Sequence, residues 1–158
     1  MTSVLFVCLG NICRSPTAEG VFRQLLAQQG VAEAIRVDSA GTGAWHVGEP
    51  PDARAQAAAR TRGVDLSKLR ARQVSPDDFE IFDHILAMDE SNLTDLADLC
   101  PPRHRSKLRL FLEFAPHAEE REVPDPYFGG DDGFGRVLDL VEAASRGFLA
   151  HLQQGAPR

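Results

Sequence analysis

The chain is poor in cysteine and in hydrogen-bonding aromatics: its 158 residues include three cysteines, one tryptophan and one tyrosine. The odd cysteine count argues against a disulfide framework, and no second cysteine pair or paired histidines complete a zinc site. No apolar run approaches the roughly 20 residues that cross a bilayer, and no leader precedes the first apolar run. The sequence therefore predicts a cytoplasmic protein with no metal and no membrane partner.

Basic residues are also in the minority. Seventeen lysines and arginines stand against 23 acidic residues, so the formal charge is −6. Non-specific nucleic-acid binding depends on basic surfaces, so nucleic acid is not an expected partner. Any affinity for an anion must then be local. The length and the 43% hydrophobic content fit one domain over residues 1–158.

Short apolar runs alternate with helical patterns along the chain. Such alternation predicts an α/β fold with a parallel sheet, in which ligands bind beyond the carboxyl ends of the strands. The expected strands are residues 4–7, 35–37, 82–88 and 108–112. The expected helices run from Ser15-Pro16 to Gly30, over 53–62, from Ser75, and over 89–99 and 134–152.

The loop after the first strand reads Cys8-Leu9-Gly10-Asn11-Ile12-Cys13-Arg14-Ser15. A helix start supplies unpaired N–H groups and a positive dipole end, which favour a thiolate at Cys8. If the loop curls, its N–H groups form a nest for phosphate oxygens, while Gly10 permits close approach or positive φ and Asn11 tolerates a left-handed conformation. The guanidinium of Arg14 can bind two phosphate oxygens at once through paired hydrogen bonds. Taken alone, Cys8 could equally be a buried strand-end residue and Arg14 a surface charge.

The segment from Cys8 to Pro16 resembles the signature of the low-molecular-weight protein tyrosine phosphatases. Residues 37–42, 45–48, 87–93 and 125–127 resemble further family segments, in the family's order. The resemblance implies a single three-layer α/β domain with a four-stranded parallel sheet flanked by helices. It also implies hydrolysis of phosphotyrosine and aryl phosphates through a phosphocysteine, without a metal or cofactor.

Residue roles follow from the same resemblance. Cys8 corresponds to the nucleophile, Arg14 to the arginine that binds phosphate and its transition state, and Asp125 to the general acid and base that protonates the leaving phenolate. Without the family, Asp125-Pro126 could equally be a plain turn. The phosphate-binding loop would be completed by Leu9, Gly10, Asn11, Ile12, Cys13 and Ser15.

Five further residues take supporting roles in this prediction. Ser15 would donate to the thiolate, although it also fits a helix N-cap. Asn11 and Ser39 would brace the loop. Trp45 and Tyr127 would wall the cleft and stack on the substrate ring, with Trp45 as a lid on the core as the alternative.

Different roles are expected for the other two cysteines, Cys13 and Cys100. The resemblance implies a reversible disulfide between Cys13 and Cys8, and Cys100 is expected to be a buried helix-end thiol. One departure affects the brace: many members carry a histidine shortly before the segment that matches residues 71–73, and this chain does not. His46 or a water is a candidate substitute.

Three other functions are considered. A thiol-dependent arsenate reductase needs two further cysteines, and only Cys100 is available. Protein-arginine phosphatases tend to carry threonine where Ile12 stands. A non-catalytic phosphotyrosine-binding module would lack Cys8 or Asp125. The expected partners are a phosphotyrosine protein, with a bacterial tyrosine kinase as one candidate, and inorganic phosphate as product and inhibitor.

Overall fold

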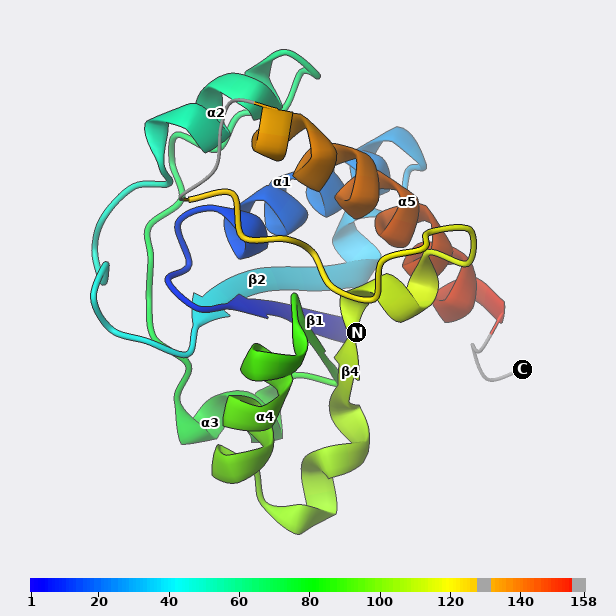
Figure 1. Cartoon of the computed structure of the whole chain (residues 1–158). Coiled ribbons are helices and arrows are strands. Elements are labelled where there is room, and N and C mark those ends of the chain that lie inside the picture. Colours follow the sequence, from blue (N-terminus) through cyan, green and yellow to red (C-terminus); the bar gives the residue numbers. More distant parts are fainter. Residues whose placement is uncertain (128–131, 155–158) are drawn as a thin grey trace.

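The computed structural model describes residues 1–127 and 132–154 (Figure 1). In chain order its elements are β1 (Thr2–Cys8), α1 (Arg14–Gln28), the 3-10 helix η1 (Ala32–Ala34), β2 (Ile35–Gly41), α2 (Ala53–Arg60), α3 (Pro76–Ile81), β3 (His84–Ala87), α4 (Glu90–Leu99), the 3-10 helix η2 (Pro102–Lys107), β4 (Leu108–Leu110), the 3-10 helix η3 (Phe111–Phe114) and α5 (Asp132–Gln154). Within these residues no helix has the length and apolar character that crossing a membrane requires.

The four strands form one parallel sheet in the order β2-β1-β3-β4. The chain leaves β1 for β2 on one side and then returns across it to β3 on the other side. In such sheets the point where the strand order reverses is where ligands bind, beyond the carboxyl ends of the strands. Here that point lies at the ends of β1 and β3, so the predicted α/β fold is confirmed and the loop after β1 lies at this edge.

Helices cover both faces of the sheet, which explains why β1 is apolar without interruption from Val4 to Cys8 (Figure 1). Successive strand side chains point to opposite faces. Val4 and Phe6 therefore join the core shared with α1 and α5, whereas Leu5 and Val7 join the core under α3 and α4. All four side chains are fully buried.

A chain of aromatic rings links the first face of the sheet to α1, η3 and α5. Phe6 lies edge-on to Phe22 at 5.8 Å and to Phe111 at 5.0 Å between ring centroids. Phe148 of α5 lies 5.5 Å from Phe22 and 5.0 Å from Phe114. Such edge contacts add to the hydrophobic stabilisation of burial. They fix α1 against the sheet, and with it the N-terminal end of α1, which follows the loop after Cys8.

Several expected boundaries are wrong, among them the third strand, which covers His84–Ala87 and not residues 82–88. Helix α1 begins at Arg14, with Cys13 in the N-cap position and no side-chain cap, so Ser15 lies inside the first turn and is not the cap. The fourth strand ends at Leu110, where the chain turns into η3, and does not continue to residue 112. The expected start of α3 is confirmed, since the Asp78 carboxylate accepts the backbone N–H of Ser75 at 2.8 Å.

Gly147 marks a place where α5 and η3 are in backbone contact. A Cβ at this position would overlap the carbonyl oxygen of Phe114, a backbone atom that a rotamer change cannot move away. Gly147→Ala should therefore lower the free energy of unfolding in urea titrations by about 1–3 kcal/mol through overpacking. Gly135→Ala is the matched control on the same helix, because a Cβ there meets nothing within 4 Å. It should raise stability by roughly 0.5–1 kcal/mol through helix propensity. Equal stability of the two variants would contradict the contact.

Candidate active site

Cys8 is the last residue of β1 and is only 3% exposed. Its Sγ accepts the backbone N–H of Asn11 at 3.2 Å and lies 3.0 Å from the hydroxyl oxygen of Ser15. Hydrogen-bond donors at these positions stabilise negative charge on sulfur. The strand thus delivers a thiol to the start of α1, beside a backbone N–H and a hydroxyl group.

The loop after Cys8 is held in a tight shape from two sides. Asn11 adopts a left-handed conformation, with φ of 57°, and Gly10 does not. On the β2 side Gly41 approaches so closely that a Cβ there would lie 2.7 Å from the carbonyl oxygen of Leu9. The two residues after Gly41 donate backbone N–H groups to the carbonyls of Cys8 and Leu9, both at 2.9 Å. The end of β2 therefore shapes the floor of the loop.

A buried network of side chains braces Asn11 from below. Its Oδ1 accepts the backbone N–H of Arg72 at 3.0 Å. Its Nδ2 donates to the hydroxyl oxygens of Ser15 at 2.8 Å and Ser39 at 3.0 Å. Ser39 in turn donates to the carboxylate of Glu19 at 2.7 Å. Asn11 and Ser39 thus lie where the sequence predicts bracing residues.

No histidine takes part in this brace. His46, the candidate from the sequence, turns its Nδ1 to the Glu49 carboxylate at 2.9 Å on the rim of the loop. The backbone of Arg72 and the carboxylate of Glu19 occupy the positions around Asn11 and Ser39 instead. Of the two candidate substitutes for that histidine, His46 does not brace the loop.

Arg14 is the first residue of α1, and its guanidinium is buried. Its Nη1 donates to the Asp89 carboxylate at 2.6 Å and to the carbonyl of Val123 at 3.0 Å. Asp89 also caps α4 by accepting the backbone N–H of Asn92 at 2.7 Å. Burial lowers the pKa of Arg14, but the Cys8 and Asp89 charges raise it by more, so the guanidinium stays charged. One carboxylate thus fixes both a helix start and the arginine.

Asp125 reaches the same site from a distant segment. Its carboxylate lies 3.8 Å from Nη2 of Arg14 and accepts the backbone N–H of Tyr127 at 3.0 Å. The Asp125 side chain is 40% exposed, so it faces the opening of the site. The fold therefore brings Cys8, Arg14 and Asp125 together, although Asp125 follows Arg14 by more than a hundred residues.

These residues line one cavity of about 130 Å³. Its walls are Cys8, Leu9, Gly10, Ile12, Cys13, Arg14, Trp45, His46, Asp125 and Tyr127. Apart from His46, each of them was predicted as a site residue. Trp45 is 72% exposed and stands at the rim, which rules out the alternative of a lid on the core.

Arg54 connects the rim to the segment that carries Asp125. It donates to the backbone carbonyl of Tyr127 at 2.9 Å, and its guanidinium lies 5.6 Å from the Tyr127 ring and 5.0 Å from the Phe134 ring. A pair of hydrogen bonds to Asp52, at 3.1 Å each, orients it. These contacts tie the start of α2 to Tyr127 across the cleft.

The second thiol of the loop is buried and poorly acidic. Burial, followed by the nearby Asp52 charge, raises the pKa of Cys13 to about 12. Cys13 therefore stays a thiol at neutral pH and is a poor nucleophile there. Cys100 is buried in the core under α3 and α4, at the end of its helix as expected, and does not line the cavity.

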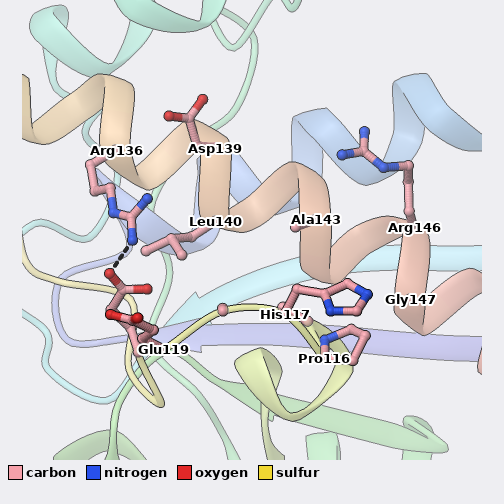
Figure 2. A pocket seen from close by; sticks show the side chains of 12 residues that line it. Pro116, His117, Glu119, Arg136, Asp139, Leu140, Ala143, Arg146 and Gly147 are labelled. Atoms are coloured by element: carbon pink, nitrogen blue, oxygen red, sulfur yellow. Dashed lines mark hydrogen bonds and ion pairs between the residues drawn. The ribbon is translucent and has the colours of Figure 1, made fainter.

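A larger groove of about 710 Å³ lies between α5 and residues 115–120 (Figure 2). Arg136 pairs with Glu120 across it, and Asp139, Arg146 and His117 add charges of both signs. No cysteine lines this groove. Its described lining carries charges of both signs and no thiol, so the smaller cavity at Cys8 is the candidate site.

The sequence did not assign Asp89, Glu19, Arg54 or Arg72 to the site. Asp89 was within reach of sequence reasoning, because it follows a buried strand directly and therefore lies at the ligand-binding edge. Glu19 and Arg54 are charged residues on α1 and α2, and Arg72 lies in the extended segment before α3; for such residues a solvated surface position is the usual case. Only the packing of these elements shows their contacts with the loop, the brace and the rim.

Comparison with known proteins gives one consistent answer. Residues 3–157 match the family model described as low molecular weight phosphotyrosine protein phosphatase. The low molecular weight protein-tyrosine-phosphatase YfkJ of Bacillus subtilis is 42% identical over 98% of this chain and 97% of its own. A crystal structure of protein tyrosine phosphatase from Entamoeba histolytica has a TM-score of 0.96 at 39% identity, covering 98% and 99% of the two chains.

A solved structure with a different named activity is also similar. The Drosophila arginine phosphatase DARP has a TM-score of 0.91 at 34% identity, over 99% of this chain and all of that one. The fold is thus shared by enzymes named for two phosphorylated side chains. The family match over nearly the whole sequence, together with Cys8 and Arg14 in one cavity, shows that the chain belongs to the low-molecular-weight protein-tyrosine phosphatase family.

Proposed function

We propose that the protein hydrolyses phosphotyrosine in proteins, and aryl phosphates generally, through a phosphocysteine on Cys8. The observation that carries this proposal is the convergence of Cys8, Arg14 and Asp125 on one small cavity. The thiolate attacks phosphorus, the P–O bond to the phenol breaks, and the phosphoryl group passes to sulfur. Water then attacks phosphorus, which breaks the S–P bond and releases inorganic phosphate, the expected product and inhibitor.

Arg14 stabilises the charge that spreads over the phosphoryl oxygens during transfer. Its Nη1 is occupied by Asp89 and the Val123 carbonyl, so Nη2 and Nε are the donors for phosphate. The bond to Asp89 holds the guanidinium plane in place before the substrate arrives, which reduces the reorganisation needed for transfer. The backbone N–H groups of residues 9–15 complete the cradle at the start of α1.

Asp125 supplies the proton for the leaving phenolate. A phenolate has a conjugate acid with a pKa of roughly 10, so it departs more readily as the phenol. The position of Asp125 at the opening, with Arg14 on one side, supports this role, because the ester oxygen of a phosphate bound at Cys8 faces the opening. The same carboxylate then accepts a proton from the water that attacks the phosphocysteine.

The rim favours an aromatic substrate. Trp45 and Tyr127 provide flat apolar surfaces on which a phenyl ring can stack, and Ile12 adds an apolar wall. Arginine phosphatases tend to carry threonine at the Ile12 position, so Ile12 argues for the aryl substrate. Phosphoarginine is the second candidate substrate because of the similarity to the Drosophila enzyme. An arsenate-reductase relay finds no support, because Cys100 lies in the other core.

The physiological partner is a phosphotyrosine protein, with a bacterial tyrosine kinase as one candidate. The cytoplasmic location and the single domain over residues 1–158 stay predictions from the sequence. A redox role for Cys13 is proposed as well, because this thiol shares the cavity with Cys8.

The first prediction concerns the substrate class. Steady-state assays with peptides carrying phosphotyrosine, phosphoserine or phosphoarginine should give the highest kcat/KM for phosphotyrosine, with activity unchanged by a chelator. Cys8→Ser should bind the phosphotyrosine peptide and not turn it over. Preference for phosphoarginine would favour the second candidate, and turnover by Cys8→Ser would contradict the phosphocysteine mechanism.

The second prediction concerns the general acid. Asp125→Asn should lower kcat/KM for phenyl phosphate by roughly 10²–10⁴-fold and should lose the alkaline limb of the pH profile, because that limb reports the protonated carboxyl. The loss should be smaller for p-nitrophenyl phosphate, whose phenolate needs less help. Glu49→Gln, a carboxylate on the rim that does not line the cavity, should stay close to wild type. An equal loss for both substrates would argue against proton transfer by Asp125.

The third prediction concerns oxidation. Peroxide should convert the Cys8 thiolate to a sulfenic acid, with which the Cys13 thiol condenses, releasing water and forming a disulfide. A dithiol should then restore activity in wild type and in the Cys100→Ser control, and less in Cys13→Ser. Because the pKa of Cys13 is about 12, protection should increase as the pH rises toward that value. Recovery of Cys13→Ser to the wild-type level would refute the role.

A further inference from the structure

Glu19 is a buried carboxylate that the reaction described above does not use. Its side chain is 4% exposed and lies on α1, one turn beyond Ser15. Oε2 accepts two hydrogen bonds from Arg23, at 3.0 and 2.9 Å, and Oε1 accepts the hydroxyl of Ser39 at 2.7 Å. Burying a carboxylate is costly unless its lone pairs are satisfied. Its contact with the brace gives a reason for its presence.

The donors and acceptors of the brace have only one consistent assignment. The backbone N–H of Arg72 can only donate, so Oδ1 of Asn11 faces it and Nδ2 faces the two serines. At the other end, a carboxylate can only accept, so Ser39 donates its hydrogen to Glu19. The oxygen of Ser39 is then free to accept one hydrogen of Nδ2, and the second goes to Ser15.

This assignment determines where the Ser15 hydroxyl points. Its oxygen accepts from Asn11 at 2.8 Å, so its own hydrogen must go to another acceptor. The two acceptors within reach are the Cys8 sulfur at 3.0 Å and the carbonyl of Ala40 at 3.4 Å. The shorter contact goes to sulfur, and an ionised thiolate attracts the hydrogen more strongly than a neutral carbonyl.

We propose that Glu19 is a positioning residue. By accepting the Ser39 hydrogen it leaves the Ser39 oxygen free to hold Nδ2 of Asn11, and it thereby steadies the amide group that turns the Ser15 hydroxyl toward the sulfur of Cys8. The effect passes through Ser39 and Asn11, in a buried setting where successive hydrogen bonds strengthen one another. Burial raises the pKa of Glu19, and the hydrogen bonds from Ser39 and Arg23 oppose that shift. This inference rests on the proposed roles of Cys8 and Ser15.

Glu19→Gln tests the proposal with almost no change of shape. Arg23 presents only donors, so it should hold the glutamine carbonyl and leave the NH₂ group facing Ser39. Ser39 then receives a hydrogen where it formerly gave one, its own hydrogen loses the acceptor that Glu19 provided, and its hold on Asn11 weakens. We expect the pH midpoint of Cys8 alkylation by iodoacetamide to rise by about one unit. Tandem mass spectrometry of the peptide Met1–Arg14 separates Cys8 from Cys13.

A phosphatase assay adds a second measurement. With phenyl phosphate, kcat should fall roughly tenfold while KM changes little, since a charge-assisted hydrogen bond to the departing thiolate is weakened. Glu142→Gln is the matched control, because it removes a carboxylate that pairs with Arg62 away from the brace. An unchanged midpoint and an unchanged kcat in Glu19→Gln would overturn the proposal.

The double variant Glu19→Gln/Arg23→Gln separates orientation from mere stability. Without Arg23, the glutamine can turn its carbonyl to Ser39, so the midpoint should return toward wild type even though an ion-pair partner has been removed. A midpoint that stays at, or moves beyond, the Glu19→Gln value would contradict orientation by Glu19.

A second variant tests the proposal if Glu19→Gln does not fold. Ser39→Ala should give the same upward shift, because it removes the link between Glu19 and Asn11. A wild-type midpoint in Ser39→Ala would refute the proposal. Since alkylation needs no phosphatase turnover, loss of the proposed function would appear as an inactive wild type, independently of these midpoints.

Discussion

The buried guanidinium of Arg14 is the group on which the geometry of the site depends. An isolated charge in this position would be strongly destabilising, and its partners are what make the burial tolerable. Asp89 at the start of α4 and the Val123 carbonyl supply them at 2.6 and 3.0 Å. Three segments that are far apart in sequence are thereby held at the edge of the sheet, and the unoccupied side of the guanidinium faces Asp125.

The polar brace below the loop meets a related constraint. A left-handed Asn11 is strained, and such strain persists only where the surroundings over-determine it. Asn11 therefore makes hydrogen bonds with both ends of its side chain, and the network ends on the buried carboxylate of Glu19. A fully satisfied polar network in a low-dielectric interior is rigid, which suits a loop that must present its N–H groups in one arrangement. A histidine is one way to complete such a network, and this chain uses a carboxylate and a backbone N–H instead.

Sequence reasoning was accurate where one pattern had one physical meaning. The uninterrupted apolar run of β1 required burial on both faces, and the capping pattern at Ser75 fixed the start of α3. It failed where a residue type had two uses. Ser15 fits a helix N-cap as well as it fits a hydroxyl beside a thiol. In the structure Cys13 is at the N-cap position and the Ser15 hydroxyl lies beside the Cys8 sulfur. The run from Leu108 to Leu112 suits a strand or a buried turn, and packing against α5 bent it after Leu110.

The sequence by itself determined the family, the order of the strands and α-helices, and the loop that follows β1, because these depend on local spacing and on residues that are neighbours in the chain. It also identified Asp125, but only through resemblance to the family. The tertiary structure alone decided the partners of those residues: Asp89 for Arg14, Glu19 and Arg72 for the brace, and Arg54 for the rim. Hydrogen bonds between distant segments depend on how helices and strands pack, and no local pattern carries that information.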